Sequence, residues 1–343
     1  MVAVRWRPPG VWRVVAGISP QAAAGILLAV AADAALGDPP DLAHPVAAFG
    51  QAMTRLEGRV WADSKLSGVG YCAAGVGVGA GVGLVAAAVG SSVGAKGRVA
   101  AAAVAGFIAI GSRSLREAAS GVACALDAGD LVLARRRVRS LVGRNPEGLD
   151  GGEIARAVVE SVAENTVDAV IAPMLWGLLA GAPGVLAYRA VNTMDAMVGH
   201  HSSRYERFGW ASARLDDAAN WLPARVAAAL VCICSPPKTR QILHAVRTQA
   251  PAHPSPNAGV AEAAFAAALG VTLGGVNVYS GRVETRPPLG RGRPAEPVDI
   301  EAACRLSQRV VLGACGALVA AWVLAGARAS RVSRGVSRTP AGR

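Results

Sequence analysis

Two acidic motifs carry the residue types that could bind a metal ion. Glu164 and Asp168 are four residues apart, and Asp216 stands four residues before Asn220. Residues at this spacing lie on one face of a helix, where two carboxylates repel each other unless a cation lies between them. Carboxylate oxygens suit Mg²⁺, which keeps several of its waters and binds substrate phosphates. The predicted magnesium ligands are Glu164, Asp168, Asp216 and Asp217.

Each acidic motif adjoins an apolar segment, which begins at Ala169 after the first motif and at Trp221 after the second. A solvated helix face is the simpler interpretation of such charges. However, carboxylates at the mouth of a membrane helix are costly and often functional. Because the two motifs occupy matching positions, they could face each other across a helical bundle, with Asn165 and Asn220 orienting the ligands.

A third polar cluster covers residues 188–206. Asn192 and Asp195 are three residues apart and therefore share a helical face. His200, which His201 follows, could act as a base near neutral pH or as a metal ligand, although a histidine pair is more often structural. The sequence contains no His-Glu-x-x-His pattern, which argues against a zinc hydrolase. The predicted catalytic residues are Asn192, Asp195 and His200.

Two smaller polar groups lie beside other apolar segments. Asp38 and His44 follow the first apolar run, where prolines fix the backbone as a helix leaves the membrane. A plain helix-ending turn explains them equally well. Farther along, Ser255 or Asn257 could cap an alanine-rich helix that contains Glu262. By themselves, these last residues have a structural interpretation.

The composition indicates that the bilayer must position these residues. Apolar residues make up 52% of the chain and charged residues 17%, and the mean hydropathy is +0.37, which is high for a soluble protein. A membrane span needs roughly 20 apolar residues. The apolar runs are residues 14–36, 68–90, 99–111, 169–188, 221–234 and 310–327, of which 99–111 and 221–234 are short. The first run could instead be a cleaved signal peptide.

We predict an all-α fold, a polytopic integral membrane helical bundle with polar helical loops. Strand signals are weak throughout. Residues 126–142 and 152–167 have helical patterns between the spans, and residues 285–297 are rich in Pro, Gly and Arg and indicate a loop. The predicted organisation is a single catalytic domain over residues 1–327, with five or six spans, followed by a basic disordered tail at 328–343.

The glycines of the second apolar run indicate helix packing. Gly75, Gly79 and Gly83 repeat at the four-residue spacing that lets membrane helices approach closely. They do not form a phosphate-binding loop, because no Lys-Ser/Thr pair follows them, and no Walker A motif occurs anywhere in the sequence.

The net charge of +12 does not by itself indicate nucleic-acid binding. The sequence has neither a zinc-finger spacing nor a basic strand interleaved with aromatic residues, so no nucleic-acid partner is expected. The six cysteines are scattered, and the closest pair, Cys232 and Cys234, lacks the Cys-x-x-Cys spacing of a metal or redox site. We interpret them as reduced structural thiols.

In their order along the chain, these motifs resemble the CobD/CbiB family, the adenosylcobinamide-phosphate synthases of cobalamin (vitamin B12) biosynthesis. The resemblance covers most of residues 20 to 327. The matching segments are GDPP and HPV within 37–46, ENTVDAVIAP at 164–173, AYRAVNTMDAMVG at 187–199, RYERFGWASARLDDAANWLPAR at 204–225, SPNAG at 255–259, EAA at 262–264 and LGVTLGG at 269–275.

The resemblance implies a multi-pass protein of the bacterial inner membrane that uses ATP. It implies a ligase that forms an amide bond between a propionate of adenosylcobyric acid and (R)-1-amino-2-propanol or its O-phosphate, giving adenosylcobinamide or its phosphate. The expected partners are the corrinoid, the amine and the lipid bilayer, and other cobalamin-pathway enzymes are further candidates.

The sequence departs from the family pattern at three places. Relatives tend to carry Arg-Asp where Arg144-Asn145 stands here, and they often have Asp-Gly where Asp168-Ala169 stands. After Gly199, many have an aromatic residue followed by a basic one where His200-His201 stands here. The last departure argues against a universal catalytic role for His201.

The implied reaction suggests roles for the remaining residues. Phosphorylation of the carboxylate by ATP would give an acyl phosphate, which the amine attacks, and Mg²⁺ would stabilise the charge that develops. Asp195 or His200 could accept the proton of the ammonium, and Arg189 and Arg204 could hold a phosphate or a propionate. The predicted substrate-binding residues are Asp38, His44, Arg189, Arg204, Tyr205, Asn257 and Glu262.

Other functions remain open on the sequence alone. A Mg²⁺-dependent membrane prenyl- or phosphotransferase also uses two acidic motifs at helix ends. A transporter would also explain intramembrane carboxylates, but the chain has no evident inverted repeat. A membrane scaffold would explain the helix caps but not the two matched acidic motifs. The sequence contains no nucleotide-binding signature, so it does not locate an ATP site.

Overall fold

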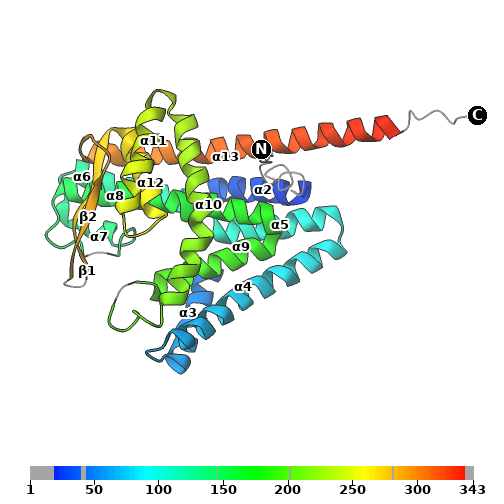
Figure 1. The fold of residues 1–343 in the computed structure, drawn as a ribbon, viewed down its shortest axis with the longest axis horizontal. Coiled ribbons are helices and arrows are strands. Elements are labelled where there is room, and N and C mark those ends of the chain that lie inside the picture. Colours follow the sequence, from blue (N-terminus) through cyan, green and yellow to red (C-terminus); the bar gives the residue numbers. More distant parts are fainter. Residues whose placement is uncertain (1–18, 40–43, 144, 201, 280–281, 337–343) are drawn as a thin grey trace, which may run out of the picture.

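Helices dominate the fold, and a small sheet lies at one end of the molecule (Figure 1). The computed structural model describes the chain except residues 1–18, 40–43, 144, 201, 280–281 and 337–343. The α-helices are α2 (Pro20–Leu36), α3 (Pro45–Val60), α4 (Lys65–Ser92), α5 (Ala95–Ala109), α6 (Ser112–Asp127), α7 (Leu131–Val138), α8 (Gly151–Thr166), α9 (Ala172–Val198), α10 (Trp210–Cys234), α11 (Thr239–Thr248), α12 (Ala258–Leu269) and α13 (Pro297–Val336). A π-helical segment, η2 (Val167–Ile171), joins α8 to α9, and the 3-10 turns η3 (Pro236–Lys238) and η4 (Ala250–Ala252) flank α11.

Among the described residues, five helical stretches are long and apolar enough to cross a membrane, which confirms the predicted multi-pass helical fold. The short apolar runs at 99–111 and 221–234 belong to longer helices. The first run is described only from Pro20, as the 17-residue helix α2. The five stretches are Lys65–Ser92, Ala95–Asp127, Gly151–Val198, Trp210–Cys234 and Pro297–Ala320.

Helix α4 separates a lipid-facing side from a packed side. Val78, Val82 and Val85 are more than half exposed, as expected for side chains that lipid covers. On the packed side, a Cβ atom at Gly79 would lie 2.6 Å from the carbonyl oxygen of Leu186 in α9. Added Cβ atoms at Gly75 and Gly83 would also collide with α9. The predicted small-residue packing motif is therefore confirmed.

Helix α9 is a hairpin rather than a straight rod, and this corrects the prediction of a single span at residues 169–188. Asn192 lies 24 residues after Asp168, which would separate the two by about 36 Å along one helix, yet their side chains are hydrogen-bonded at 3.3 Å. The chain reverses at Gly181, whose backbone is left-handed (φ 62°). Pro183 follows, and it lacks the N–H needed to continue the first arm.

Helix α8 is anchored in the main core of the protein. Its N-terminus is closed by a capping box in which Asp150 Oδ1 accepts from the Glu153 N–H at 2.8 Å and Glu153 Oε2 accepts from the Asp150 N–H at 2.9 Å. Ile154, Val158 and Val162 are fully buried and belong to the large apolar cluster that also includes side chains of α6, α12 and α13. This packing fixes the helix that leads into the first acidic motif.

A small three-stranded sheet accompanies the helices and corrects the prediction that residues 285–297 form a loop. Its strands are β1 (Val271–Tyr279), β2 (Arg282–Leu289) and β3 (Arg293–Pro294), in the order β2-β1-β3. The prolines of this region are tolerated because β2 and β3 are edge strands, where some backbone N–H groups need no partner. A register irregularity between Leu273 and Gly275 in β1 further obscures the alternating pattern in the sequence.

The C-terminal helix is longer than the sequence predicts. Helix α13 continues to Val336 and so includes the first nine residues of the region 328–343, for which the sequence predicts a disordered tail. Its far end projects beyond the other helices (Figure 1). Residues 337–343 lie outside the described chain.

Candidate functional site

The first acidic motif lies at the junction between α8 and α9. Asp168 is part of the π-helical segment η2, and such bulges inside helices are frequent at functional sites. The Asp168 side chain is half-buried, whereas the Glu164 side chain is accessible to solvent although many protein atoms surround it. Glu164 is therefore open to a ligand, and Asp168 is held within the helices.

The second arm of the α9 hairpin fixes Asp168 in place. Asn192 Nδ2 donates to Asp168 Oδ2 at 3.3 Å, and Arg189 donates to the side-chain oxygen of Asn192 at 3.1 Å. The Tyr188 hydroxyl lies 3.1 Å from the main-chain oxygen of Asp168 and 2.9 Å from Asn220 Oδ1. Because the hairpin reverses the chain, residues from positions 168 and 188–192 meet at its base.

Helix α10 brings the second acidic motif to the same place. Asn220 is buried, and its Nδ2 donates to Asp216 Oδ2 at 3.0 Å. Trp176 in the first arm of α9 donates from Nε1 to the carbonyl oxygen of Ala219 at 3.1 Å. Tyr188 and Asn220 thus link the two acidic motifs directly, as expected if they face each other across a bundle.

Four carboxylates from four helical segments (α8, η2, α9 and α10) form one cluster, which we call the carboxylate cluster: Glu164, Asp168, Asp195 and Asp216. Asp168 interacts electrostatically with the three others, and Asp195 interacts with Asp216 and Glu164. Like charges this close repel one another, so an arrangement of this kind is favourable when a cation neutralises it.

Two buried polar atoms beside the carboxylate cluster could serve a Mg²⁺ ion that is bound together with a phosphate. Asp216 Oδ1 is buried and, among the described residues, has no hydrogen-bond partner. The same holds for the buried Nε of Arg189, so one free acceptor and one free donor are left. Among the described residues, no group of three His, Cys, Asp or Glu side chains is arranged so that it could hold a metal ion by itself. Mg²⁺ commonly takes one or two carboxylates and completes its shell with waters and substrate phosphates.

The remaining residues predicted for the magnesium site have other contacts. Asp217 lies 3.8 Å from Arg214, and it acts on the carboxylate cluster through its charge. Asn165 Nδ2 donates to the carbonyl oxygen of Ser161 at 2.9 Å, within its own helix. Of Asn165 and Asn220, the two amides predicted to orient the metal ligands, Asn220 donates directly to a carboxylate.

The structure separates the two candidate bases. Asp195 is half-buried within the carboxylate cluster. His200 is exposed, and its ring contacts the edge of Tyr205, with a centroid distance of 5.0 Å. No interaction among the described residues joins His200 to the carboxylates, and His201 lies outside the described residues. Of the two groups, Asp195 is the one that belongs to the carboxylate cluster.

Arg204 and Tyr205 bind to helix α3 through Glu57. Arg204 lies 2.9 Å from Glu57 Oε1, and the Tyr205 hydroxyl donates to the same oxygen at 2.9 Å. The Arg204 guanidinium also stacks over Trp61, 4.6 Å from the ring centroid. These contacts attach the segment after α9 to α3, so both side chains are already engaged within the protein.

Asp38 and His44 lie on either side of the undescribed residues 40–43. His44 Nδ1 accepts from the Val46 N–H at 3.2 Å and thereby caps α3. The Asp38 side chain is exposed, and its main-chain N–H donates to Ser114 Oγ at 3.4 Å. His44 therefore has a structural role, while Asp38 remains accessible.

Asn257 connects α10 to the start of α12. Its Nδ2 donates to the carbonyl oxygen of Asp217 at 2.8 Å, and its Oδ1 accepts from Arg225 at 2.9 Å. The hydroxyl of Ser255 accepts from the Ala258 N–H at 3.1 Å. Asn257 occupies the N-cap position of α12 without a side-chain cap hydrogen bond, and it holds the second acidic motif against this helix.

A second group of charged side chains is buried beside the first. Glu262 in α12 is fully buried, and its Oε1 lies 3.7 Å from His253 Nε2 and 3.9 Å from the guanidinium of Arg286 in β2. Arg286 also lies 3.1 Å from Glu284, and its charge acts on Glu164. The sheet thus supplies a cation between Glu262 and the carboxylate cluster.

The buried His253 makes the stability of the folded protein decrease at acidic pH. Burial is the largest effect on His253 and lowers its pKa below the usual 6.5, although Glu262 is near. The unfolded chain therefore takes up the proton first, and stability falls as pH drops below about 6.5. We expect the apparent melting temperature to fall between pH 7 and 5.5 in the wild-type chain, and to fall less in His253→Asn, which keeps a neutral acceptor. Equal slopes for the two proteins would contradict this assignment.

Tyr188 links both acidic motifs, but its residue type alone did not mark it as a site residue. We expect Tyr188→Phe to lower turnover about tenfold or more. Without the Tyr188 hydroxyl, the buried Asn220, which orients Asp216, loses one of its hydrogen-bond partners, and each such hydrogen bond contributes roughly 1 kcal/mol. Steady-state kinetics of the purified variant measures the loss. Tyr205→Phe is the matched control, since its hydroxyl binds Glu57 instead, and an equal loss in both variants would count against a specific role for Tyr188.

Comparison with known sequences shows which proteins the chain is similar to. The family described as CobD/Cbib protein matches residues 26–307 of the chain. A cobalamin biosynthesis protein CobD of Mycobacterium tuberculosis is 46% identical over 295 residues, which cover 85% of this chain and 93% of that protein. The protein of the same name from Geobacter metallireducens is 42% identical over 300 residues, which cover 86% and 93%.

No solved structure matches the chain. The family match extends from α2 to α13 and includes all four members of the carboxylate cluster. A match over this much of the sequence, together with relatives above 40% identity, establishes that the chain belongs to the CobD/CbiB family.

Proposed function

We propose that this protein acts in cobalamin biosynthesis as a ligase of the membrane. The reaction joins a propionate of adenosylcobyric acid to (R)-1-amino-2-propanol or its O-phosphate in an amide bond, and it consumes ATP. The single observation that carries the proposal is the carboxylate cluster, in which two acidic motifs separated by 48 residues (168 to 216) meet at the base of the α9 hairpin. Membership of the CobD/CbiB family indicates the biosynthetic pathway, and the carboxylate cluster offers a site at which Mg²⁺ and a phosphate could bind.

The chemistry requires activation, since a free carboxylate has no good leaving group. Transfer of the terminal phosphoryl group of ATP to the propionate would give an acyl phosphate and ADP. Attack by the amine nitrogen then forms the C–N bond, and inorganic phosphate leaves with the C–O bond electrons. Mg²⁺ bound to the carboxylates would neutralise phosphate charge during this transfer.

The chain's own side chains supply positioning and proton transfer. Arg189, whose Nε lacks a partner among the described residues, would hold a phosphate oxygen beside the cluster. Asn192 fixes Asp168, and Asn220 fixes Asp216. The attacking amine must lose a proton as the amide forms, and Asp195 is the half-buried carboxylate in a position to accept it.

A turnover assay tests the proposal. The purified full chain in detergent is incubated with adenosylcobyric acid, ATP, Mg²⁺ and either aminopropanol or its O-phosphate. The mass of the corrinoid product is then measured by mass spectrometry. We expect a gain equal to the amine minus one water with at least one of the two amines. No gain with either amine, from protein shown to be folded, would contradict the proposal.

A second candidate function rests on the same paired acidic motifs. A Mg²⁺-dependent membrane prenyl- or phosphotransferase would also place carboxylates from two helices around a diphosphate. Incubation with a labelled prenyl diphosphate separates the two functions. Transfer of label in place of amide formation would favour the transferase, and we expect no transfer.

A further inference from the structure

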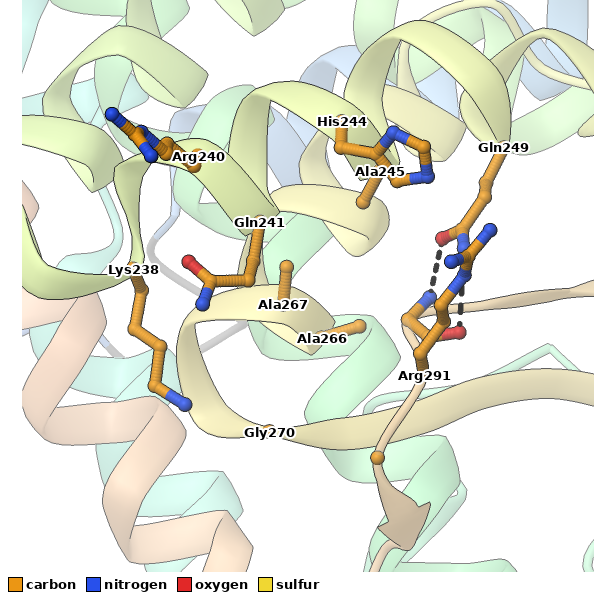
Figure 2. A pocket seen from close by; sticks show the side chains of 12 residues that line it. Lys238, Arg240, Gln241, His244, Ala245, Gln249, Ala266, Ala267, Gly270 and Arg291 are labelled. Carbon is orange, nitrogen blue, oxygen red and sulfur yellow. Dashed lines mark hydrogen bonds between the residues drawn. The ribbon is translucent and has the colours of Figure 1, made fainter.

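A groove with a basic rim lies on the outer surface formed by α11, α12 and the segment after β2 (Figure 2). Its volume is about 600 Å³, which is within the usual range for a small-molecule site. Its lining residues have no described contact with the carboxylate cluster. They are Lys238, Arg240, Gln241, His244, Ala245, Gln249, Ala266, Ala267, Gly270, Gly290, Arg291 and Gly292.

The charges of this basic groove are all of one sign. Lys238, Arg240 and Arg291 contribute cations, and no acidic residue lines the groove. Among the described residues, none of these three cations forms an ion pair. In Figure 2, the Lys238 side chain extends along one side toward Gly270, while Arg291 stands at the other side below Gln249. Uncompensated cations on two sides of a concave surface attract an anion.

The wall that carries Arg291 is fixed by hydrogen bonds. Gln249 Oε1 accepts from the Gly290 N–H at 2.7 Å, and Gln249 Nε2 donates to the Gly290 carbonyl at 3.5 Å (Figure 2). Thr272 holds the same segment by donating to the Gly292 carbonyl at 2.8 Å. A preorganised wall loses little conformational entropy when a ligand binds.

A structural role explains only part of this arrangement. Lys238 lies near Gly270, where α12 ends, and a cation there stabilises the free carbonyl groups of that helix. Arg291 is exposed and lies on the opposite side, so the end of α12 does not account for it. Between the two cations lies the half-buried Ala267, whereas Ala266 is fully buried.

We propose that the basic groove binds a phosphate-bearing ligand whose uncharged part rests against Ala267. Phosphate oxygens suit Lys and Arg donors on two sides. Two sources carry this chemistry, a soluble phosphate compound and the headgroup of an anionic lipid. The site is separate from the carboxylate cluster, and its ligand needs no metal ion, because the groove supplies the positive charge itself.

The test measures binding without Mg²⁺, so that the carboxylate cluster cannot hold phosphate through a metal. The full chain in zwitterionic nanodiscs with EDTA is titrated with tripolyphosphate and with ATP in a calorimeter. A second arm measures retention of phosphatidylglycerol against phosphatidylcholine by native mass spectrometry. The double variant Lys238→Met/Arg291→Met removes both cations but keeps their stems. Its matched control, Arg136→Met/Arg247→Met, removes two exposed cations that do not line the groove.

We expect the double variant to weaken binding of one of the two ligand types by about 100-fold, since each charge-assisted contact contributes roughly tenfold. The control should change binding less than about threefold. Loss in the first arm identifies a soluble phosphate compound as the ligand, and loss in the second identifies a lipid. Equal binding by the wild-type chain and the double variant in both arms, or no binding in either, would overturn the proposal whether or not the protein forms amides.

Discussion

Replacing Asp168 or Asp216 with asparagine should abolish most turnover and raise the Mg²⁺ requirement. Both carboxylates lie in the carboxylate cluster, and each is held by a buried or half-buried amide, Asn192 or Asn220. Loss of a residue that only orients a metal ligand commonly costs about 10- to 100-fold in metal affinity or activity. Loss of a ligand itself should cost at least as much. Turnover is measured over a Mg²⁺ titration, and the Mg²⁺ concentration that gives half-maximal turnover should be higher in each variant than in the wild-type chain.

The control for this experiment is Asp63→Asn, which removes an exposed carboxylate whose described ion pair, with Arg207, is 3.8 Å long. It should leave turnover and the Mg²⁺ dependence unchanged. If Asp168→Asn and Asp216→Asn both retain wild-type turnover at limiting Mg²⁺, the assignment of the carboxylate cluster as the metal site is wrong.

Gly79→Leu should prevent α4 from packing on α9 and so destabilise the membrane bundle. A Cβ at this position already lies 2.6 Å from the Leu186 carbonyl, and 2.9 Å from the Ala190 Cβ. Backbone atoms cannot move aside as a flexible side chain can, so the cost is at least the roughly 1–3 kcal/mol of ordinary overpacking. We expect the apparent melting temperature in detergent to fall by about 5 °C or more, or the folded yield to collapse.

Gly77→Leu is the matched control on the same helix. A Cβ added at Gly77 meets no atom within 4 Å, and the residue is exposed, so a leucine there faces lipid. Replacing glycine in a helix by leucine also favours the helical backbone. The control should therefore be neutral or slightly stabilising, and a similar loss in both variants would show that close packing against α9 is not the cause.

The membrane-spanning character and the acidic motifs are readable from the sequence because they depend on local patterns. Apolar runs identify α4 and α10, and the four-residue glycine spacing identifies the packed side of α4. The spacing of Glu164 and Asp168 marks the first motif, and the matching positions of the two motifs beside apolar segments suggest that they meet. All these signals lie within a single helix or its immediate flank.

The reversal of α9 is not visible in hydropathy, because the sequence stays apolar from Ala169 through Gly181 to Ala187. The local signal was Gly181, followed by Ala182 and Pro183, a combination that interrupts a helix. A single span through these residues would have left Asp168 and Asn192 at opposite ends. The hairpin instead places Tyr188, Asn192 and Asp195 beside the acidic motifs, which explains why the third polar cluster belongs to the same site.

The sheet was missed because its strands lack an alternating pattern. Two prolines follow Arg286 in β2, and paired glycines interrupt β1, so the region has the composition of a loop. Arg286 was consequently not recognised as a partner of Glu262. Long-range pairing decides this element, and local propensity does not.

Binding of Mn²⁺, as a substitute for Mg²⁺, would test most directly whether the carboxylate cluster is a metal site. Electron paramagnetic resonance can follow Mn²⁺ added to the full chain in nanodiscs in the presence of ATP. We predict that the wild-type chain binds Mn²⁺, so that the signal of free Mn²⁺ decreases and a signal of bound Mn²⁺ appears. The double variant Asp168→Asn/Asp216→Asn should show no bound signal, and Asp63→Asn should behave as the wild type. An equal bound signal from the wild type and the double variant would contradict the account, because the metal would then lie elsewhere.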